Sequence, residues 1–122
     1  MSNKKNAIDF LQLVVKRKID DAYKKYVYMN GKHHNLFFPA GFPALLKAMK
    51  ENHEQYPDTQ IRIKNAIEEG DLVAVHSHVI HTPGTLGVTV VHMFKMKNNK
   101  IVEMWDCGMP IPKKSPNKDG PF

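Results

Sequence analysis

Two residues that could do acid/base chemistry lie within otherwise apolar stretches. His92 interrupts the apolar run 88–94, and Asp106 lies in the largely apolar run 102–107. If these runs are antiparallel strands joined at Asn98-Asn99, residues at equal distances from that turn lie opposite each other. His92 and Asp106 are almost equally far from the turn, so we expect them to be cross-strand neighbours. A carboxylate beside an imidazole on one sheet face can act as a general acid/base pair. The alternative is a buried structural ion pair.

A second pair, His76 and His78, has strand spacing, so both side chains should share a face. Two neutral imidazoles can ligate zinc, iron or copper. The run Gly70-x5-His76-x-His78 has the spacing that opens a cupin metal motif, but the glutamate expected shortly afterwards and a downstream glycine–proline–histidine segment are both missing. The two histidines are therefore either metal ligands or hydrogen-bonded sheet residues lining or flanking a pocket.

Two further features allow two interpretations each. The triplet His33-His34-Asn35 is expected in a loop, where it could bind a ligand at a cavity mouth or form a capped turn with exposed imidazoles. The methionines could line a pocket for a flat apolar ligand or serve as adaptable core filler. Cys107 is interpreted as a small buried hydrophobe. As the single cysteine, it excludes an internal disulfide and a cysteine-based metal site.

Helical periodicity in the first half gives way to strand periodicity in the second. Apolar residues three and four apart predict a helix through residues 7–15, a second helix beginning at Asp20-Asp21, and a third beginning near Pro43. Residues 29–41 are predicted to form a loop, because Asn30-Gly31 is a turn signal and Pro39 and Gly41 interrupt any helix. Alternating residues predict strands over 61–67, 72–80, 87–96 and 101–108, separated by turns.

Helices followed by an antiparallel meander indicate an α+β fold. We expect a curved, mostly antiparallel sheet folded around the N-terminal helices, which would leave a cone with an internal cavity. The predicted organisation is one domain over residues 1–112, followed by a Pro/Lys-rich tail over 113–122 that is poorly suited to regular structure.

The composition argues against two kinds of partner. The 18 Lys and Arg residues exceed the 12 Asp and Glu residues, giving a net charge of +6, but the basic residues are scattered and only Arg17 and Arg62 are arginines. Because arginine is preferred for bidentate recognition of bases and phosphates, we expect no nucleic-acid partner. The apolar runs are too short to span a membrane, and the first residues show no apolar signal core, so a cytoplasmic location is expected.

Several segments together resemble the SnoaL-like polyketide cyclases, which belong to the nuclear transport factor 2-like superfamily. Over roughly residues 5 to 112, the order of the motifs is similar, and the ending around Trp105-Asp106 is the most specific part. The segments that carry the resemblance are Glu69–His78, the turn Thr82-Pro83-Gly84, Asn99–Asp106, and Tyr28 with His34-Asn35 and Gly41.

The resemblance implies a cone-shaped α+β barrel, usually dimeric through the outer sheet face, with a pocket between sheet and helices. In the cyclases, an aspartate on the last strand is the general acid/base of an intramolecular aldol condensation, and a histidine on the preceding strand assists it. Asp106 and His92 occupy these positions. That chemistry requires no metal or organic cofactor. The substrate would be a small hydrophobic carbonyl compound, and the candidate pocket or rim residues are Tyr28, His34, His76, His78 and Trp105.

Two alternatives from other functional classes remain. The same pocket could belong to a non-catalytic binding module for a hydrophobic metabolite, since the superfamily includes such members. The protein could also be a cupin-like metal protein centred on His76 and His78. Turnover that depends on Asp106 would favour the enzyme over the binding module, and metal analysis of untagged protein would test the cupin-like alternative.

Overall fold

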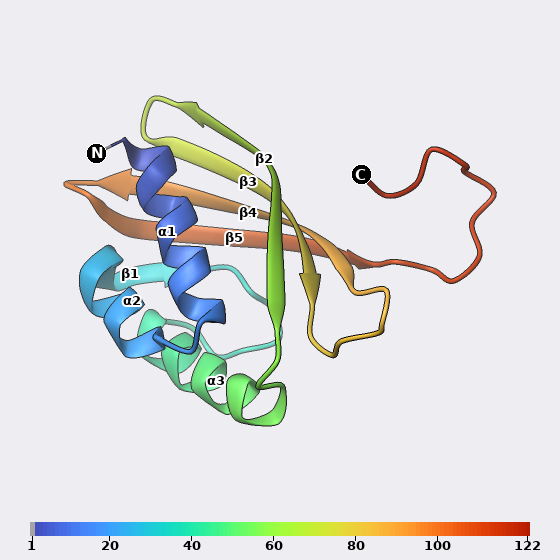
Figure 1. Cartoon of the computed structure of the whole chain (residues 1–122). Coiled ribbons are helices and arrows are strands. Elements are labelled where there is room, and N and C mark those ends of the chain that lie inside the picture. The colour runs from blue at the N-terminus through green and yellow to red at the C-terminus, as the bar shows by residue number, and fades with distance from the viewer. Residues whose placement is uncertain (1) are drawn as a thin grey trace.

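The computed structural model describes residues 2–122, in which three helices cover one face of a curled five-stranded sheet (Figure 1). The strand order is β1-β5-β4-β3-β2, and the sheet is open, with β1 and β2 at its edges. The predicted α+β fold is confirmed, although the sheet does not close into a barrel. The elements are α1 (Asn3–Val15), α2 (Ile19–Tyr26), β1 (Val27–His33), α3 (Phe42–Gln55), β2 (Gln60–Glu69), β3 (Leu72–Ile80), β4 (Val88–Lys97) and β5 (Lys100–Pro110).

Local signals account for the helix starts. The Ser2 hydroxyl accepts a hydrogen bond from the Lys5 backbone N–H at 3.2 Å and so caps α1. Asp20 and Asp21 lie in the first turn of α2, where the helix dipole favours negative charge. Pro43 lies in the first turn of α3, where its missing N–H costs nothing.

The predicted loop over residues 29–41 is wrong in its first part, because β1 (Val27–His33) runs through it and pairs in parallel with β5. Gly31 explains the error. A Cβ at this residue would lie 2.3 Å from the Val102 carbonyl oxygen, so the glycine permits close approach to β5 rather than a turn. The pairing partner is distant in sequence, and the ladder is irregular between Val27 and Lys32. Local patterning therefore gave no signal for this strand.

The antiparallel meander β2-β3-β4-β5 follows the predicted order. Gly70 has a φ of 59° in the β2–β3 turn, and Asn98 and Asn99 have φ values of 51° and 63° in the β4–β5 turn. Positive φ at both central residues defines the tight turn that matches strand twist, and asparagine tolerates it well. This turn sets the register between β4 and β5.

The core lies between the helices and the inner face of the sheet. The rings of Phe10 on α1 and Phe94 on β4 pack edge to face at 5.9 Å, and Phe10 also packs against Tyr23 on α2 at 5.5 Å. Val73 and Val75 on β3 are fully buried on the same inner face. Side chains alternate along a strand, so the neighbouring residues of β3, including His76 and His78, belong to the outer face.

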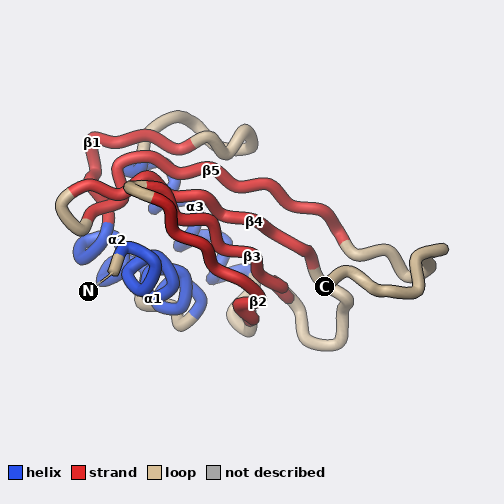
Figure 2. Tube along the Cα trace, turned by 90° about the horizontal axis from the view of Figure 1, so that it is seen from above, coloured by secondary structure: helices blue, strands red, loops and turns tan. Residues whose placement is uncertain are grey.

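Beyond β5, residues 111–122 contain no helix or strand. The Ile111 backbone N–H donates to the Gly87 carbonyl at 3.0 Å, and the segment then turns back toward the sheet (Figure 2). The Phe122 ring centroid lies 4.8 Å from that of His78 and 5.4 Å from that of His76, so the end of the tail contacts the outer face. In the described part of the chain, no helix is long and apolar enough to cross a membrane.

Candidate functional site

The predicted pairing of His92 and Asp106 is confirmed: the two residues are direct partners in the β4–β5 ladder. Both side chains lie on the inner face and line a cavity between the sheet and the helices. The outer part of this cavity has a volume of about 290 Å³. A deeper extension of about 60 Å³ is lined by His92, Asp106 and apolar side chains such as Phe10 and Leu45. The polar pair therefore lies where the two parts of the cavity meet.

Asp106 is held by an amide rather than by the histidine. The Asn35 Nδ2 donates to Asp106 Oδ2 at 3.0 Å. The Asn35 Oδ1 accepts a hydrogen bond from the Phe37 backbone N–H at 3.0 Å, which fixes the amide so that its NH₂ group faces the carboxylate. Within residues 2–122, no hydrogen bond joins the side chains of His92 and Asp106. One carboxylate oxygen thus has a fixed donor, and Oδ1 is left without one.

The loop that carries Asn35 is fastened by His33, which ends β1 and is buried. The His33 Nδ1 accepts a hydrogen bond from the Asn35 backbone N–H at 3.1 Å, so the neutral ring carries its proton on Nε2. That Nε2–H donates to the Pro39 carbonyl at 2.8 Å. His33 is therefore a positioning residue for Asn35, neither an exposed imidazole nor a group that lines the cavity.

Burial lowers the pKa of His92, and the nearby Asp106 carboxylate opposes this only in part. The imidazole is therefore neutral near pH 7. Its ring lies parallel to that of Phe94, with centroids 6.0 Å apart and an interplanar angle of 9°. Its Nδ1 is buried and has no hydrogen-bond partner in the described residues. A neutral imidazole with an unused nitrogen beside a carboxylate can exchange a hydrogen bond or a proton with a bound molecule.

His76 and His78 share a face, as predicted, but it is the outer face, away from His92 and Asp106. His76 Nε2 is hydrogen-bonded to Thr89 Oγ1 at 2.8 Å, and His78 Nε2 donates to the Leu86 carbonyl at 2.7 Å. Among residues 2–122, no three His, Cys, Asp or Glu side chains are grouped so as to hold a metal ion. The geometry gives the cupin-like alternative no third ligand.

The remaining predicted pocket residues also lie outside this cavity. His34 Nε2 is hydrogen-bonded to Glu103 Oε2 at 2.6 Å, and its ring stacks on Trp105 at 5.2 Å. The hydrogen bond from His34 lowers the pKa of the Glu103 carboxyl. Tyr28 lines a separate, lysine-rich groove on the outer face. The expectation of a buried Cys107 is wrong, because its side chain alternates with that of Asp106 and is exposed.

Two further histidines, His53 and His81, line the cavity but were not among the predicted site residues. Both were detectable from periodicity. His53 follows Leu45 and Met49 at steps of one helical turn, which places it on the buried face of α3. His81 follows β3 with the alternation of Val79, opposite to that of His76 and His78, and so lies toward the inner face.

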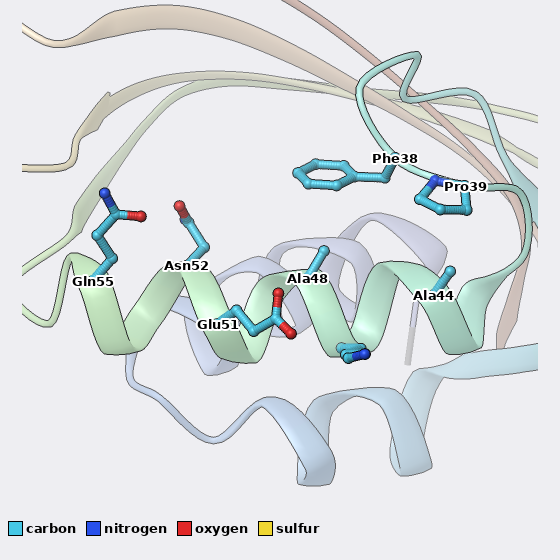
Figure 3. A pocket seen from close by; sticks show the side chains of 8 residues that line it. Phe38, Pro39, Ala44, Ala48, Glu51, Asn52 and Gln55 are labelled. Carbon is cyan, nitrogen blue, oxygen red and sulfur yellow. The ribbon is translucent and has the colours of Figure 1, made fainter.

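A second hollow, of about 490 Å³, lies over an adjacent side of α3, beneath Phe38 and Pro39 (Figure 3). Phe38 and Asn52 line both this hollow and the cavity, so the two spaces are neighbours. The hollow is lined by Glu51, Gln55 and two alanines, and it contains no histidine. The candidate acid/base side chains, His92 and Asp106, therefore line the cavity and not this hollow.

Solved structures with this fold resemble the chain over most of its length. A proposed ketosteroid isomerase from Kribbella flavida DSM 17836 gives a TM-score of 0.74 at 12% identity, over 96% of this chain and 84% of that one. IdmH, a proposed polyketide cyclase from Streptomyces antibioticus, gives a TM-score of 0.71 at 16% identity, over 88% of this chain and 92% of that one. An NTF2-like protein of unknown function from Cytophaga hutchinsonii gives a TM-score of 0.72 at 12% identity, over 90% of this chain and 92% of that one.

At these identities, the likeness establishes the fold alone. A comparison with curated proteins gave no match. The sequence itself carries the assignment, because the family model for the SnoaL-like domain matches residues 9–104, most of the chain. On this match, the chain belongs to the SnoaL-like domain family.

Proposed function

We propose that the protein is a cofactor-independent acid/base enzyme that removes a proton alpha to the carbonyl of a small hydrophobic substrate. One observation carries the proposal: Asp106, held through Oδ2 by Asn35 at 3.0 Å, lies beside His92 in a cavity between sheet and helices. The family match and the cyclase and isomerase descriptions of two structural neighbours support the reaction class.

Asp106 is the proposed base. Its Oδ1 takes the α-proton, and the C–H electron pair moves into the enolate while the carbonyl oxygen gains negative charge. Return of the proton to another carbon completes an isomerisation. Alternatively, the enolate carbon attacks a second carbonyl of the same molecule, and the Asp106 carboxyl gives its proton to the new alkoxide. The Asn35 hydrogen bond keeps Oδ1 oriented throughout.

His92 is the proposed donor to the enolate oxygen. Burial lowers the pKa of His92, so the ring is neutral and offers one N–H rather than a full charge. A positioned donor of this kind, in a site from which water is excluded, contributes about 3–4 kcal/mol to transition-state stability. The apolar wall of Leu11, Val14 and Met49 favours a hydrophobic substrate body and keeps water from the enolate.

The test is α-proton exchange of 2-tetralone in D₂O, followed by ¹H NMR. Asp106→Asn should lower the exchange rate by about 10²–10⁴-fold, since general-base catalysis contributes on that scale. Glu103→Gln is the matched control, because it makes the same chemical change on the outer side of β5. Undiminished exchange in Asp106→Asn would refute the role of Asp106. Saturable binding of 2-tetralone without exchange would identify a binding module instead.

We also infer that two copies of the chain associate through the outer sheet face. Val91, Met93 and Met109 on that face are 40%, 37% and 61% exposed, and the register places them near one another on β4 and β5. Exposed apolar side chains grouped on one sheet face favour a protein partner. Light scattering coupled to size-exclusion chromatography should give twice the monomer mass, and Met93→Lys should shift it to the monomer value.

A further inference from the structure

The cavity contains buried hydrogen-bonding atoms that the protein leaves unused. In the described residues, four buried side-chain polar atoms lack a partner, and three of these are the Nδ1 atoms of His53, His81 and His92. All three rings line the same cavity. Buried polar groups in proteins are nearly always hydrogen-bonded, so this concentration indicates groups reserved for a bound molecule.

His53 and His81 belong to a different part of the cavity from the acid/base pair. His81 follows the end of β3, whereas Val75, the cross-strand partner of His92, lies in the middle of that strand. The His81 ring packs against Tyr56 beyond the end of α3, at 5.5 Å between centroids. His53, in the last turn of α3, is only 4% exposed. The cavity thus has two polar ends with apolar walls between them.

The charges around the two ends differ. Asp106 is the acidic side chain among the residues that line the cavity, and it lies at the His92 end. Burial lowers the pKa of His53, and the nearby Arg17 cation and the His81 ring lower it further. The electrostatic surroundings of His53 therefore favour a negative group and disfavour a cation.

We propose that His53 and His81 form a subsite for a carboxylate at the far end of the substrate, opposite the carbonyl. Two neutral imidazoles supply two N–H donors, one for each carboxylate oxygen, and Arg17 adds a favourable field. The substrate class is then a small apolar keto acid. This inference rests on the proposed function only for the placement of the carbonyl, since carboxylate binding by the subsite does not require turnover.

The experiment compares three probes that share one skeleton: 2-tetralone, 6-hydroxy-2-tetralone and 6-carboxy-2-tetralone. Their dissociation constants for the unmodified protein are measured by isothermal titration calorimetry at pH 7. The carboxylate should bind about 10–100-fold more tightly than 2-tetralone, the scale of hydrogen bonds to a charged group. Equal binding of all three, or tightest binding of the hydroxyl compound, would overturn the proposal.

Variants without an N–H donor locate the effect. His81→Leu and His53→Leu should each remove most of the preference for the carboxylate, whereas His76→Leu on the outer face should keep it. Circular dichroism checks folding. His53 is the more deeply buried of the two, so the His81 variant serves as an independent test if His53→Leu fails to fold. A preference that survives in His81→Leu would refute the subsite.

The exchange assay separates this inference from the proposed function. A preference for the carboxylate that depends on His81, with no α-proton exchange in any probe, would retain the subsite and remove the enzyme. Exchange that depends on Asp106, with no preference for the carboxylate, would retain the enzyme and remove the subsite.

Discussion

The histidines on the two faces of the sheet differ in their hydrogen bonding. On the outer face, His76 and His78 are hydrogen-bonded to Thr89 and to the Leu86 carbonyl, respectively. On the inner side, His92 lines a cavity and its Nδ1 has no partner in the described residues, as is also true of His53 and His81. On the outer face, the imidazoles with protein partners support the sheet, whereas the three with an unpartnered Nδ1 in the described residues line the cavity.

The carboxylates repeat the contrast on a single strand. Glu103 lies on the outer side of β5, is half-buried and is hydrogen-bonded to His34. Asp106 lies on the inner side, at the junction of the two parts of the cavity, and its donor is an amide that cannot neutralise it. The proposed proton transfer therefore belongs to the inner face, and substitutions matched across the sheet can test that assignment.

The largest expected difference between the faces concerns the histidines. His92→Leu should lower the rate of 2-tetralone exchange by about 10²–10³-fold, because it removes the proposed N–H donor to the enolate and supplies no other. His78→Leu should leave the rate within about twofold, because its ring is bonded to the Leu86 carbonyl on the outer face. The ¹H NMR exchange assay measures both rates. Equal losses in the two variants would abolish the distinction between the faces.

A smaller difference is expected between two adjacent loop residues. Asn35→Ala removes the donor to Asp106 and should lower kcat by about 10-fold or more, the scale of one hydrogen bond to a charged group. His34→Ala removes the contact with Glu103 and should leave kcat unchanged. Steady-state kinetics would separate kcat from KM. An Asn35→Ala effect confined to KM would mean that the amide binds substrate rather than orienting the carboxylate.

Stability should depend on pH through the inner histidines. Burial lowers the pKa of His92 below its unfolded value of about 6.5, so below that pH the unfolded state binds more protons. The free energy of unfolding should therefore fall by about 1.4 kcal/mol per pH unit for this group, from about pH 6.5 down to its folded pKa. Urea denaturation should show a shallower dependence in His92→Gln. An unchanged dependence in that variant, with His78→Gln as control, would contradict the assignment.

The smallest effect is expected at the end of the tail. Deleting residues 113–122 removes the contact of Phe122 with His76 and His78, but the segment is exposed throughout. The free energy of unfolding should change by less than about 0.5 kcal/mol, and exchange should be unaffected. Urea denaturation provides the check. A loss of several kcal/mol would show that the tail is an integral part of the outer face.

Local sequence patterns predicted the helices, the meander and the cross-strand partnership. The alternation of residues in β4 and β5, together with the turn at Asn98-Asn99, was enough to pair His92 with Asp106. The pairing is short-range: a tight turn fixes the register, and side chains of paired residues share a face.

Other parts of the site depended on contacts between distant segments. β1 was missed because its partner β5 is remote in sequence and its glycine serves a close approach rather than a turn. Asn35 reaches Asp106 only because His33 fastens the intervening loop to β1 and to Pro39. No residue in that loop signals its partner locally.

The sequence by itself determined which side chains share a face, since alternation is a property of an extended chain. Only the tertiary structure decided which face the helices cover. That choice placed His92 and Asp106 in a cavity with His53 and His81, and it placed His76, His78 and Trp105 on the opposite side. Alternation is symmetric between the two faces of a strand, and the symmetry is broken only when helices distant in sequence pack on one of them.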